Sequence, residues 1–433
     1  MTVRETALLL LSEYESSGKY VNLSLSSHKT DSLTASERTF LTVLLYTTVE
    51  RKITYDYIMS ALSARSADDV SPRVKNILRL GLCQIIHIDS VPDFAAVNET
   101  VKLAKGKGER AFVNGVLRAA VRCEGKYPMP EREKNLARYL SVFYSFPQRT
   151  VKEFIKSFGE AETEALLKAF NALPKTSFSV NTLKIKREDF VRELRQKGLE
   201  ASAAKNSSIG VKIEGSVNPC EVFGFEEGLF LVQDEASQIA VEALGVKKDD
   251  TVIDTCACPG GKSFAAYILS GGASMYAFDL HESKLSLILS GAERLGFFVN
   301  AAARDARTPD ERLFGKADKV ICDVPCSGLG VLAKKPDLRY KDIDALSNLP
   351  SLQLEILRAS SKYLKNGGEM IYSTCTLRHE ENSDVVNAFL SENADFELVD
   401  FTVGNLRSEG GMLTLLPHKH GTDGFFVAKL CRR

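Results

Sequence analysis

The chain contains 433 residues and has no net charge at pH 7; 44 % of its residues are hydrophobic and 26 % are charged. Such a chain is too long for one ordinary hydrophobic core, so we expect two or three domains of a soluble globular protein. Apolar runs such as Ala7 to Leu11 are far too short to span a membrane, and no basic-then-apolar segment precedes them, which predicts a cytoplasmic protein. Nine cysteines, an odd number without a secretion signal, argue against a disulfide framework.

Residues 1–140 are predicted to form a small bundle of helices. Apolar residues recur at helical spacing in three stretches, Thr6 to Tyr14, Phe40 to Val49 and Val74 to Ile88. Thr34 and Glu37 match a capping box ahead of the second stretch. Pro128 and Pro130 then interrupt the helical pattern, so we place the end of this domain near residue 140.

Basic residues gather near the end of this first domain. The segment Val101 to Lys126 contains seven basic residues and two acidic ones, although the whole chain is neutral. A run of this kind forms either a solvated helix face or a surface that contacts phosphates, and the sequence favours neither reading over the other.

The rest of the chain changes its pattern twice. Residues 141–235 mix short helices with extended runs such as Thr176 to Ile185, which predicts a small α+β connector. Residues 236–433 repeat strand, glycine-rich turn and helix, which is typical of a parallel sheet with helices on both faces. The predicted strands are TVIDTCA (251–257), SMYAFDL (274–280), KVICDV (319–324) and EMIYSTC (369–375). FELVDF and GFFVAKL then follow one another without a helix, so one edge strand is expected to run antiparallel.

A glycine-rich turn follows the first of these strands, in the run DTCACPGGKS (254–263). Glycines at a strand-to-helix turn let the backbone approach a ligand, and the helix start offers free amide donors. The spacing differs from the dinucleotide and P-loop motifs. Asp279 ends the next strand, where an acid can accept both hydroxyls of a ribose, and Asp305 closes the following segment, where it could face an adenine. Together these features favour a nucleoside cofactor.

Several motifs in this order make the whole chain similar to the RsmB/Sun family of S-adenosylmethionine-dependent RNA cytosine-5 methyltransferases, the bacterial small-subunit (16S) rRNA enzymes in particular. VPDFAAVNETVKLAK and FVNGVLR resemble the helical NusB-like domain of that family, and GLFLVQDEASQ resembles its pre-catalytic segment. Four further features resemble its catalytic motifs: the run D-T-C-A-C-P-G-G-K, the acid after the second strand, the run D-V-P-C-S-G and the run S-T-C-T. Cys258 stands where the family usually has a small residue such as alanine, and Leu329 where it often has threonine.

The resemblance implies an all-α NusB-like RNA-binding bundle (1–140), an α+β connector (141–235) and a seven-stranded Rossmann-like methyltransferase domain (236–433). It implies small-subunit rRNA as the partner, with no membrane and no metal, and we expect a monomer. The cofactor would be S-adenosylmethionine, with Asp279 on the ribose, Asp305 near the adenine and Asp323 closing the site. The loop that would hold this cofactor consists of Cys256, Ala257, Cys258, Pro259, Gly260, Gly261 and Lys262.

The resemblance also implies a division of labour between two cysteines. C5 of cytosine is a poor nucleophile, and a thiolate that adds to C6 raises the electron density on C5. In the family the cysteine of the S-T-C-T motif is this nucleophile, here Cys375. The cysteine of the D-x-P-C motif, here Cys326, assists product release, and Asp323 would bind the cytosine edge near N3 and N4.

Other interpretations compete with this one. The family reaction could act on another RNA, tRNA or large-subunit rRNA. An adenine-N6 methyltransferase would need no nucleophilic thiol, and an antitermination factor would need only the helical domain. A redox pair of Cys326 and Cys375 would leave Asp323 and Pro325 unexplained, and the pair Cys256 and Cys258 lacks a second metal-binding pair. The remaining cysteines are expected to be buried packing residues: Cys83, Cys123, Cys220, Cys322 and Cys431.

Overall fold

The computed structural model describes residues 1–17, 33–215 and 217–433. Its contacts divide the chain into two compact units. The first unit comprises Met1–Asn171 and Lys335–Lys341, and the second comprises Ala172–Lys334 and Asp342–Arg433. These limits differ from the boundaries at residues 140 and 235, and the three-domain division stays a prediction. No helix within the described ranges is long and apolar enough to cross a membrane.

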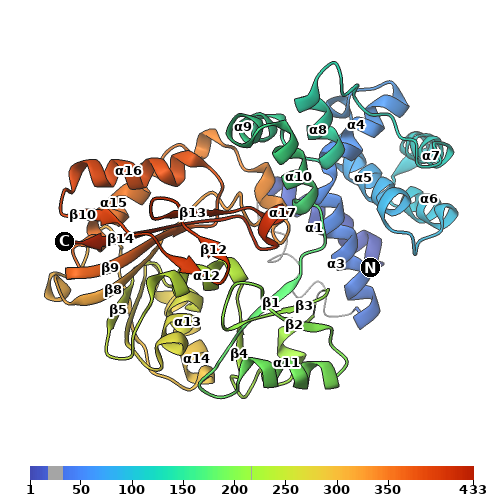
Figure 1. Cartoon of the computed structure of the whole chain (residues 1–433). Coiled ribbons are helices and arrows are strands. Elements are labelled where there is room, and N and C mark those ends of the chain that lie inside the picture. Colours follow the sequence, from blue (N-terminus) through green and yellow to red (C-terminus); the bar gives the residue numbers. More distant parts are fainter. Residues whose placement is uncertain (18–32, 216) are drawn as a thin grey trace. The chain divides into compact units, whose positions relative to one another are not determined.

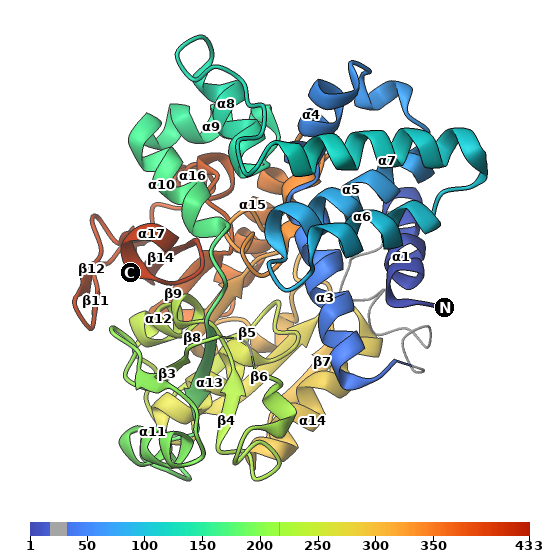
Figure 2. The ribbon, with the colours of Figure 1, turned by 90° about the vertical axis from the view of Figure 1, so that its right-hand side faces the viewer.

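The first unit is helical. Its helices are α1 (Val3–Ser17), α3 (Ala35–Glu50), α4 (Lys52–Ser63), α5 (Pro72–His87), α6 (Asp93–Lys102), α7 (Gly106–Arg122), α8 (Leu136–Tyr144), α9 (Gln148–Phe158) and α10 (Glu160–Phe170). The predicted capping box is confirmed, since Thr34 and Glu37 each accept from the other's backbone amide at the start of α3. Helix α5 is buried on most of its surface and packs against α6 and α7 (Figure 2). A Cβ atom at Gly81 would lie 2.7 Å from Leu117, so this glycine lets α5 and α7 approach closely.

A short segment from much later in the chain completes this helical unit. It contains the 3-10 helix η6 (Pro336–Tyr340). Arg339 is 1 % exposed, and its Nη1 donates to the carbonyl oxygens of Glu50 (3.2 Å) and Ser145 (3.3 Å). Its guanidinium carbon also lies 4.0 Å from the centre of the Phe146 ring. The segment therefore satisfies backbone acceptors that the helices cannot satisfy themselves.

The second unit begins with a small antiparallel sheet in the order β2-β3-β1-β4. Its elements are β1 (Thr176–Val180), α11 (Arg187–Gln196), β2 (Ala201–Ala203), β3 (Gly210–Ile213) and β4 (Phe230–Val232). Three buried aromatic rings hold α11 against this sheet. The ring of Phe230 lies 4.2 Å from that of Phe178 and 5.4 Å from that of Phe190, centre to centre. The predicted mixture of helix and strand is found here.

The larger sheet runs in the order β10-β14-β9-β8-β5-β6-β7, with β13 paired to β14 as an eighth strand. Its strands are β5 (Thr251–Asp254), β6 (Ser274–Asp279), β7 (Asn300–Ala303), β8 (Ala317–Asp323), β9 (Leu364–Thr374), β10 (Phe396–Leu398), β13 (Met412–Leu415) and β14 (Phe425–Arg432). Strands β5 to β9 are parallel, and β14 runs antiparallel to both β9 and β10. We expected an antiparallel strand at the edge of the sheet. The strand that runs antiparallel to the parallel strands is β14, and it lies inside the sheet. Residues 425–428 are buried on both faces, as an interior strand requires.

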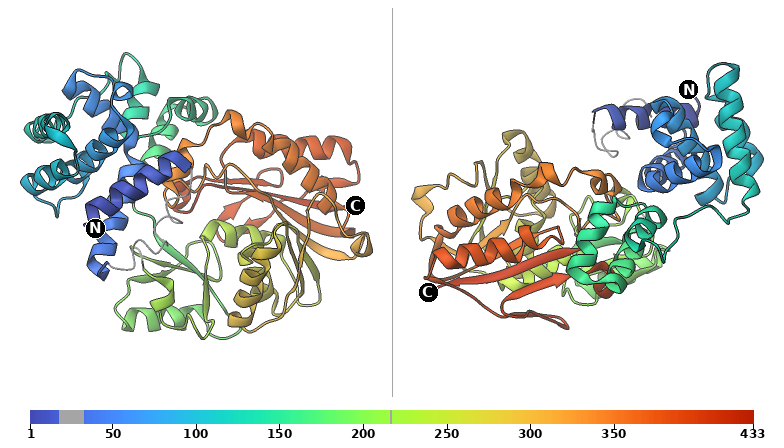
Figure 3. Two further views of the ribbon diagram at one scale, coloured as in Figure 1. Left: turned by 180° about the vertical axis from the view of Figure 1, so that it is seen from behind. Right: turned by 90° about the horizontal axis from the view of Figure 1, so that it is seen from above.

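Helices cover both faces of this sheet, as the alternating pattern predicts (Figure 1). One face packs against α12 (Glu235–Leu244), α13 (Gly261–Ser270) and α14 (Leu285–Leu295). The other packs against α15 (Leu349–Ser361) and α16 (Ser383–Glu392), which lie over the C-terminal strands in the right-hand view of Figure 3. Because the central strands are parallel, the turns after β5, β6, β8 and β9 meet at one edge of the sheet.

Candidate active site

The glycine-rich loop joins β5 to α13. Gly260 has a φ of +108°, and a Cβ atom there would lie 2.2 Å from the ring of Phe264. Only glycine suits this position. Behind the loop, the buried Asp254 accepts from the Ser263 hydroxyl (2.7 Å) and from the Cys256 amide (3.3 Å). Burial raises the pKa of Asp254 to about 7.

The carboxylate at the end of β6 lies beside this loop. Asp279 Oδ2 accepts from the amide of Cys258 (3.3 Å), and its Oδ1 accepts from the amide of His281 (3.1 Å). Each oxygen retains an acceptor position, because a carboxylate can accept about four hydrogen bonds. Amide donors at the start of α13 and a carboxylate at the next strand end form a donor and acceptor set that fits the adenosine part of a cofactor.

Asp305 is engaged by a neighbouring residue. Arg307 donates to it from its side chain (2.6 Å) and from its backbone amide (2.9 Å). The hydrogen bonds from Arg307 lower the pKa of this carboxyl group below its ordinary value. The structure places Asp305 just after β7, in the next turn along from Asp279, and its contact with an adenine stays a prediction.

The carboxylate at the end of β8 joins the cofactor loop to the strand that carries the second cysteine motif. Asp323 Oδ2 accepts from Lys262 Nζ (2.6 Å), and Oδ1 accepts from the hydroxyl of Ser373 (2.6 Å). Burial lowers the pKa of Lys262, but the charge and the hydrogen bond of Asp323, together with the charges of Asp254 and Cys375, raise the pKa above its ordinary value. Cys375 adds to this rise, which places an ammonium group within electrostatic reach of that sulfur.

The two cysteines of the D-V-P-C-S-G and S-T-C-T motifs meet at this edge. Their Sγ atoms lie 2.9 Å apart, although 48 residues separate Cys326 from Cys375 in the sequence. The loops are also joined by their backbones, since the Gly330 amide donates to the Cys375 carbonyl (2.9 Å). The hydrogen bond with Cys375, followed by burial, raises the pKa of Cys326 well above the ordinary thiol range. Both causes favour the protonated form of Cys326.

Several polar residues that were not predicted from the sequence surround these cysteines. Gln353, on α15, donates to the Pro325 carbonyl (2.9 Å) and to Glu381 (3.0 Å). The hydroxyl of Ser327 donates to Thr376 (2.7 Å). A polar residue such as Gln353 at a core-facing helical position is the signal that could have identified it.

The prediction that the five other cysteines are buried packing residues is right for two of them and wrong for three. Cys83 and Cys322 are buried, as predicted for packing residues. Cys123 and Cys431 are half-buried and Cys220 is exposed, so these three are not core residues. Cys220 lies in the short 3-10 turn η3 (Pro219–Glu221), none of whose residues is buried. In the ranges that the structure describes, no three His, Cys, Asp or Glu side chains form a group that could hold a metal ion.

The fold and the site together define an S-adenosylmethionine-dependent methyltransferase with a Rossmann-like catalytic sheet. Models of known families match the chain in three segments: the NusB family (residues 1–122), an RsmF/B-like ferredoxin-like domain (146–219) and the 16S rRNA methyltransferase RsmB/F family (241–431). The chain is 35 % identical to the probable ribosomal RNA small subunit methyltransferase B of Bacillus subtilis, over 100 % of this chain and 99 % of that one. It belongs to the RsmB/F family of 16S rRNA methyltransferases.

Two solved structures have the same fold. The crystal structure of PH0851 has a TM-score of 0.79 and 25 % sequence identity, and the match covers 100 % of this chain and 99 % of that one. NSun6 from Pyrococcus horikoshii, solved with SFG, has the same fold over 67 % of this chain and 99 % of its own, with a TM-score of 0.60 and 24 % identity.

Proposed function

We propose that the protein methylates C5 of a cytosine in small-subunit rRNA, through a covalent bond between Cys375 and C6 of the base. One observation carries the proposal: two thiols lie 2.9 Å apart, at the edge of the sheet where Asp323 and Lys262 also lie. The B. subtilis relative is named a ribosomal RNA small subunit methyltransferase, which supports the choice of RNA.

The cofactor supplies an electrophilic methyl group on a sulfonium. Its adenosine would be held by the loop Cys256–Lys262 and by Asp279, whose donors and acceptors suit the ribose and adenine groups. Asp305 follows at the next strand end. The chemistry of methyl acceptance then depends on the side chains that hold and activate the cytosine.

Cys375 begins the reaction as the nucleophile. Its Sγ forms a bond to C6, and the electron pair of the C5–C6 double bond moves to C5, which would take the methyl group as the bond between that methyl and the cofactor's sulfur breaks and its electron pair stays on that sulfur. The C5 proton is then lost to solvent, the C6–Sγ bond breaks and the double bond returns. The positive charge of Lys262 favours the thiolate that this sequence both consumes and releases.

Cys326 assists the release step as a thiol. Its raised pKa keeps the proton on sulfur, so it can donate a hydrogen bond to the Cys375 thiolate as that group leaves. Asp323 is held by Ser373 and Lys262 and presents its remaining acceptor positions to N4 and protonated N3 of the cytosine. A target base inside structured RNA must be flipped out to reach this site.

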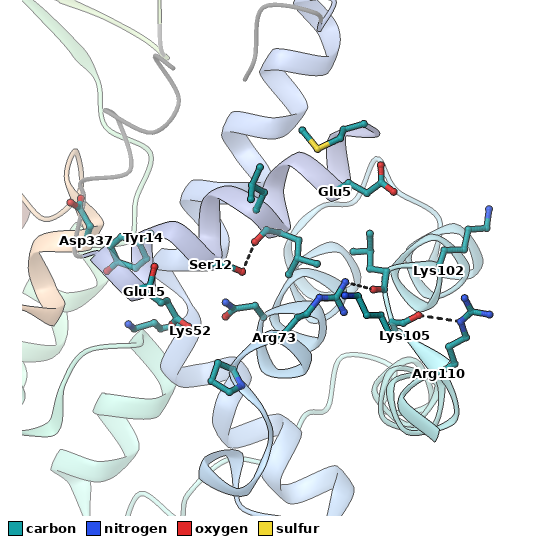
Figure 4. A pocket seen from close by; sticks show the side chains of 18 of the residues that line it. Glu5, Ser12, Tyr14, Glu15, Lys52, Arg73, Lys102, Lys105, Arg110 and Asp337 are labelled. Carbon is teal, nitrogen blue, oxygen red and sulfur yellow. Dashed lines mark hydrogen bonds between the residues drawn. The ribbon is translucent and has the colours of Figure 1, made fainter. Parts of the chain in front are cut away.

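The helical unit offers a surface for the RNA backbone. It contains a cavity of about 1580 Å³, whose lining includes Lys52, Arg73, Lys102, Lys105 and Arg110 (Figure 4). Arg73 and Arg110 donate to the carbonyls of residues 103 and 104 and so fix the turn between α6 and α7. Lys102 and Lys105 are exposed beside them. Such a cluster suits phosphate groups, and we assign RNA contact to this turn and to α7.

Denaturing electrophoresis of the enzyme with labelled rRNA and S-adenosylmethionine tests the covalent route. Cys375→Ala should abolish methylation and every covalent complex. Cys326→Ala should still attack and methylate the base, then accumulate as a covalent complex that the double variant loses. A band that forms only with Cys375→Ala would reverse the two roles, and full turnover by both single variants would exclude covalent catalysis by these thiols.

Bisulfite mapping of RNA from a strain without the gene tests the substrate. We expect the loss of one 5-methylcytosine from small-subunit rRNA. A loss confined to tRNA or large-subunit rRNA would support the alternative substrates and leave the chemistry intact.

A further inference from the structure

We propose that the adjacent residues Glu381 and Asn382 act as one clamp that sets the separation of the two thiols, Glu381 through the loop of Cys326 and Asn382 through the loop of Cys375. They are positioning residues, because their contacts are with the two loops. The inference rests on the proposed function, since it assumes that both thiols take part in the reaction.

Glu381 holds the Cys326 loop on both sides of the cysteine. Its Oε2 accepts from the amide of Ser327 (2.9 Å), the residue that follows Cys326. The same oxygen accepts from Gln353 Nε2 (3.0 Å), which also donates to the carbonyl of Pro325, the residue that precedes Cys326. Glu381 and Gln353 are both 0 % exposed, so water cannot replace either partner.

Asn382 holds the Cys375 loop in the same manner. Its Oδ1 accepts from the hydroxyl of Thr374 (2.6 Å), and its Nδ2 donates to the carbonyl of Thr376 (3.1 Å). These are the residues directly before and after Cys375. Asn382 is 3 % exposed, and both of its polar groups are satisfied by these two contacts.

The clamp itself is fixed to the fold. Tyr372, a fully buried residue of β9, donates its hydroxyl proton to the backbone carbonyl of Glu381 (2.6 Å). Arg378 Nη1 lies 3.4 Å from Glu381 Oε1. Because Glu381 and Asn382 are consecutive, neither cysteine loop can shift without straining the same short piece of backbone, so the two sulfur atoms keep their spacing.

The two halves of the clamp predict opposite kinetic defects. Glu381→Gln keeps the shape of the side chain but places an NH2 group where a carboxylate oxygen accepted hydrogen bonds. Cys326 should then be misplaced, and the covalent RNA complex should accumulate as it does in Cys326→Ala. Asn382→Ala should misplace Cys375 and slow formation of the complex, without accumulation. A misplacement of about 1 Å corresponds to a loss of about 100-fold in the affected step. Glu380→Gln and Asn387→Ala, at exposed neighbouring positions, should behave like the parent.

A second readout needs neither RNA nor turnover. Diamide takes two hydrogen atoms from a pair of nearby thiols and leaves a disulfide, and peptide mapping by mass spectrometry measures the Cys326–Cys375 bond. We expect this disulfide to form at least about tenfold more slowly in Glu381→Gln and in Asn382→Ala than in the two controls. If the Gln or Ala variant does not fold, Glu381→Asp and Asn382→Asp replace them, with the same direction expected.

Two outcomes would overturn the inference. The first is an equal rate of disulfide formation in variants and controls, and the second is the same kinetic defect for both halves of the clamp. Its failure can be told apart from that of the proposed function. Methylation by Cys375→Ala would refute the covalent route, whereas the spacing of the two thiols is read from the disulfide alone.

Discussion

Lys262 Nζ lies 2.6 Å from Asp323 Oδ2, and this ion pair joins the start of α13 to the end of β8. The side chains are only 12 % and 29 % exposed, so water screens the pair weakly. This ion pair couples the position of the loop assigned to the cofactor to the position of the carboxylate assigned to the cytosine. A change at either residue should affect both ligands.

Lys262→Met tests this coupling. The variant keeps the length of the side chain but removes the charge that fixes Asp323 and favours the Cys375 thiolate. A charged hydrogen bond of this kind contributes about 1.5 to 3 kcal/mol, so we expect the single-turnover methylation rate to fall by about 10- to 150-fold. Lys284→Met, at an exposed position near the same loop, is the control, and an unchanged rate in Lys262→Met would remove the residue from the mechanism.

Asp279→Ala should weaken S-adenosylmethionine binding. The ribose hydroxyls would lose a charged acceptor contributing about 1.5 to 3 kcal/mol, which corresponds to an affinity about 10- to 150-fold lower. Calorimetric titration of the cofactor measures this directly. The exposed Asp249, replaced by alanine in the same way, should leave the affinity as it is. An affinity unaltered by Asp279→Ala would place the ribose elsewhere.

Asp254 should make the stability depend on pH. Burial raises its folded pKa to about 7, from an ordinary value of 3.8. The folded chain therefore keeps a proton that the unfolded chain releases, so the stability from this group is complete below about pH 4 and is lost as the pH rises to about 7. The slope is at most about 1.4 kcal/mol per pH unit.

Asp254→Asn should remove this part of the slope. Its amide can accept from the Cys256 amide and donate to the Ser263 hydroxyl, which rotates to accept. Urea unfolding followed by circular dichroism between about pH 5 and pH 7 gives the free energy of unfolding of both proteins. Asp249→Asn should keep the parental slope. Parallel curves for the parent and Asp254→Asn would show that Asp254 is ionised in the folded chain.

Replacement of Lys105, Lys107 and Arg110 by glutamine should weaken rRNA binding and flatten its dependence on salt. Each lost phosphate contact lowers the slope of log K against log salt by about 0.7 to 0.9, because fewer counterions are released. The control variant replaces three exposed lysines of α9 and α10 by glutamine, which removes the same charge elsewhere: Lys152, Lys156 and Lys168. Equal slopes for the two triple variants would identify the α7 segment as an ordinary solvated face.

Much of the site could be predicted from sequence because its residues follow strands. The carboxyl ends of parallel strands share one edge, so Asp279, Asp323, Cys326 and Cys375 had to come together once the strand pattern was recognised. The local capping box at Thr34 was equally readable, since its two partners are three residues apart.

The remaining features depend on contacts between distant segments. The run RHEENSD after the second cysteine motif reads as a polar loop, so nothing local marked Glu381 or Asn382 as buried. The interior place of β14 was missed for a related reason: the order of the strands in a sheet is set by packing between segments, which the residues of a single strand do not reveal.

The segment that carries Arg339 affects the order in which the protein can be made. Ribosomes deliver the chain from its N-terminus, and domains generally fold as they emerge. The helices up to Asn171 are synthesised long before Arg339, yet that residue binds the carbonyls of Glu50 and Ser145 and covers the ring of Phe146. The N-terminal unit therefore cannot complete its own packing during its own synthesis, and it waits for a piece delivered only after strands β5 to β8, half of the strands of the catalytic sheet, have been translated.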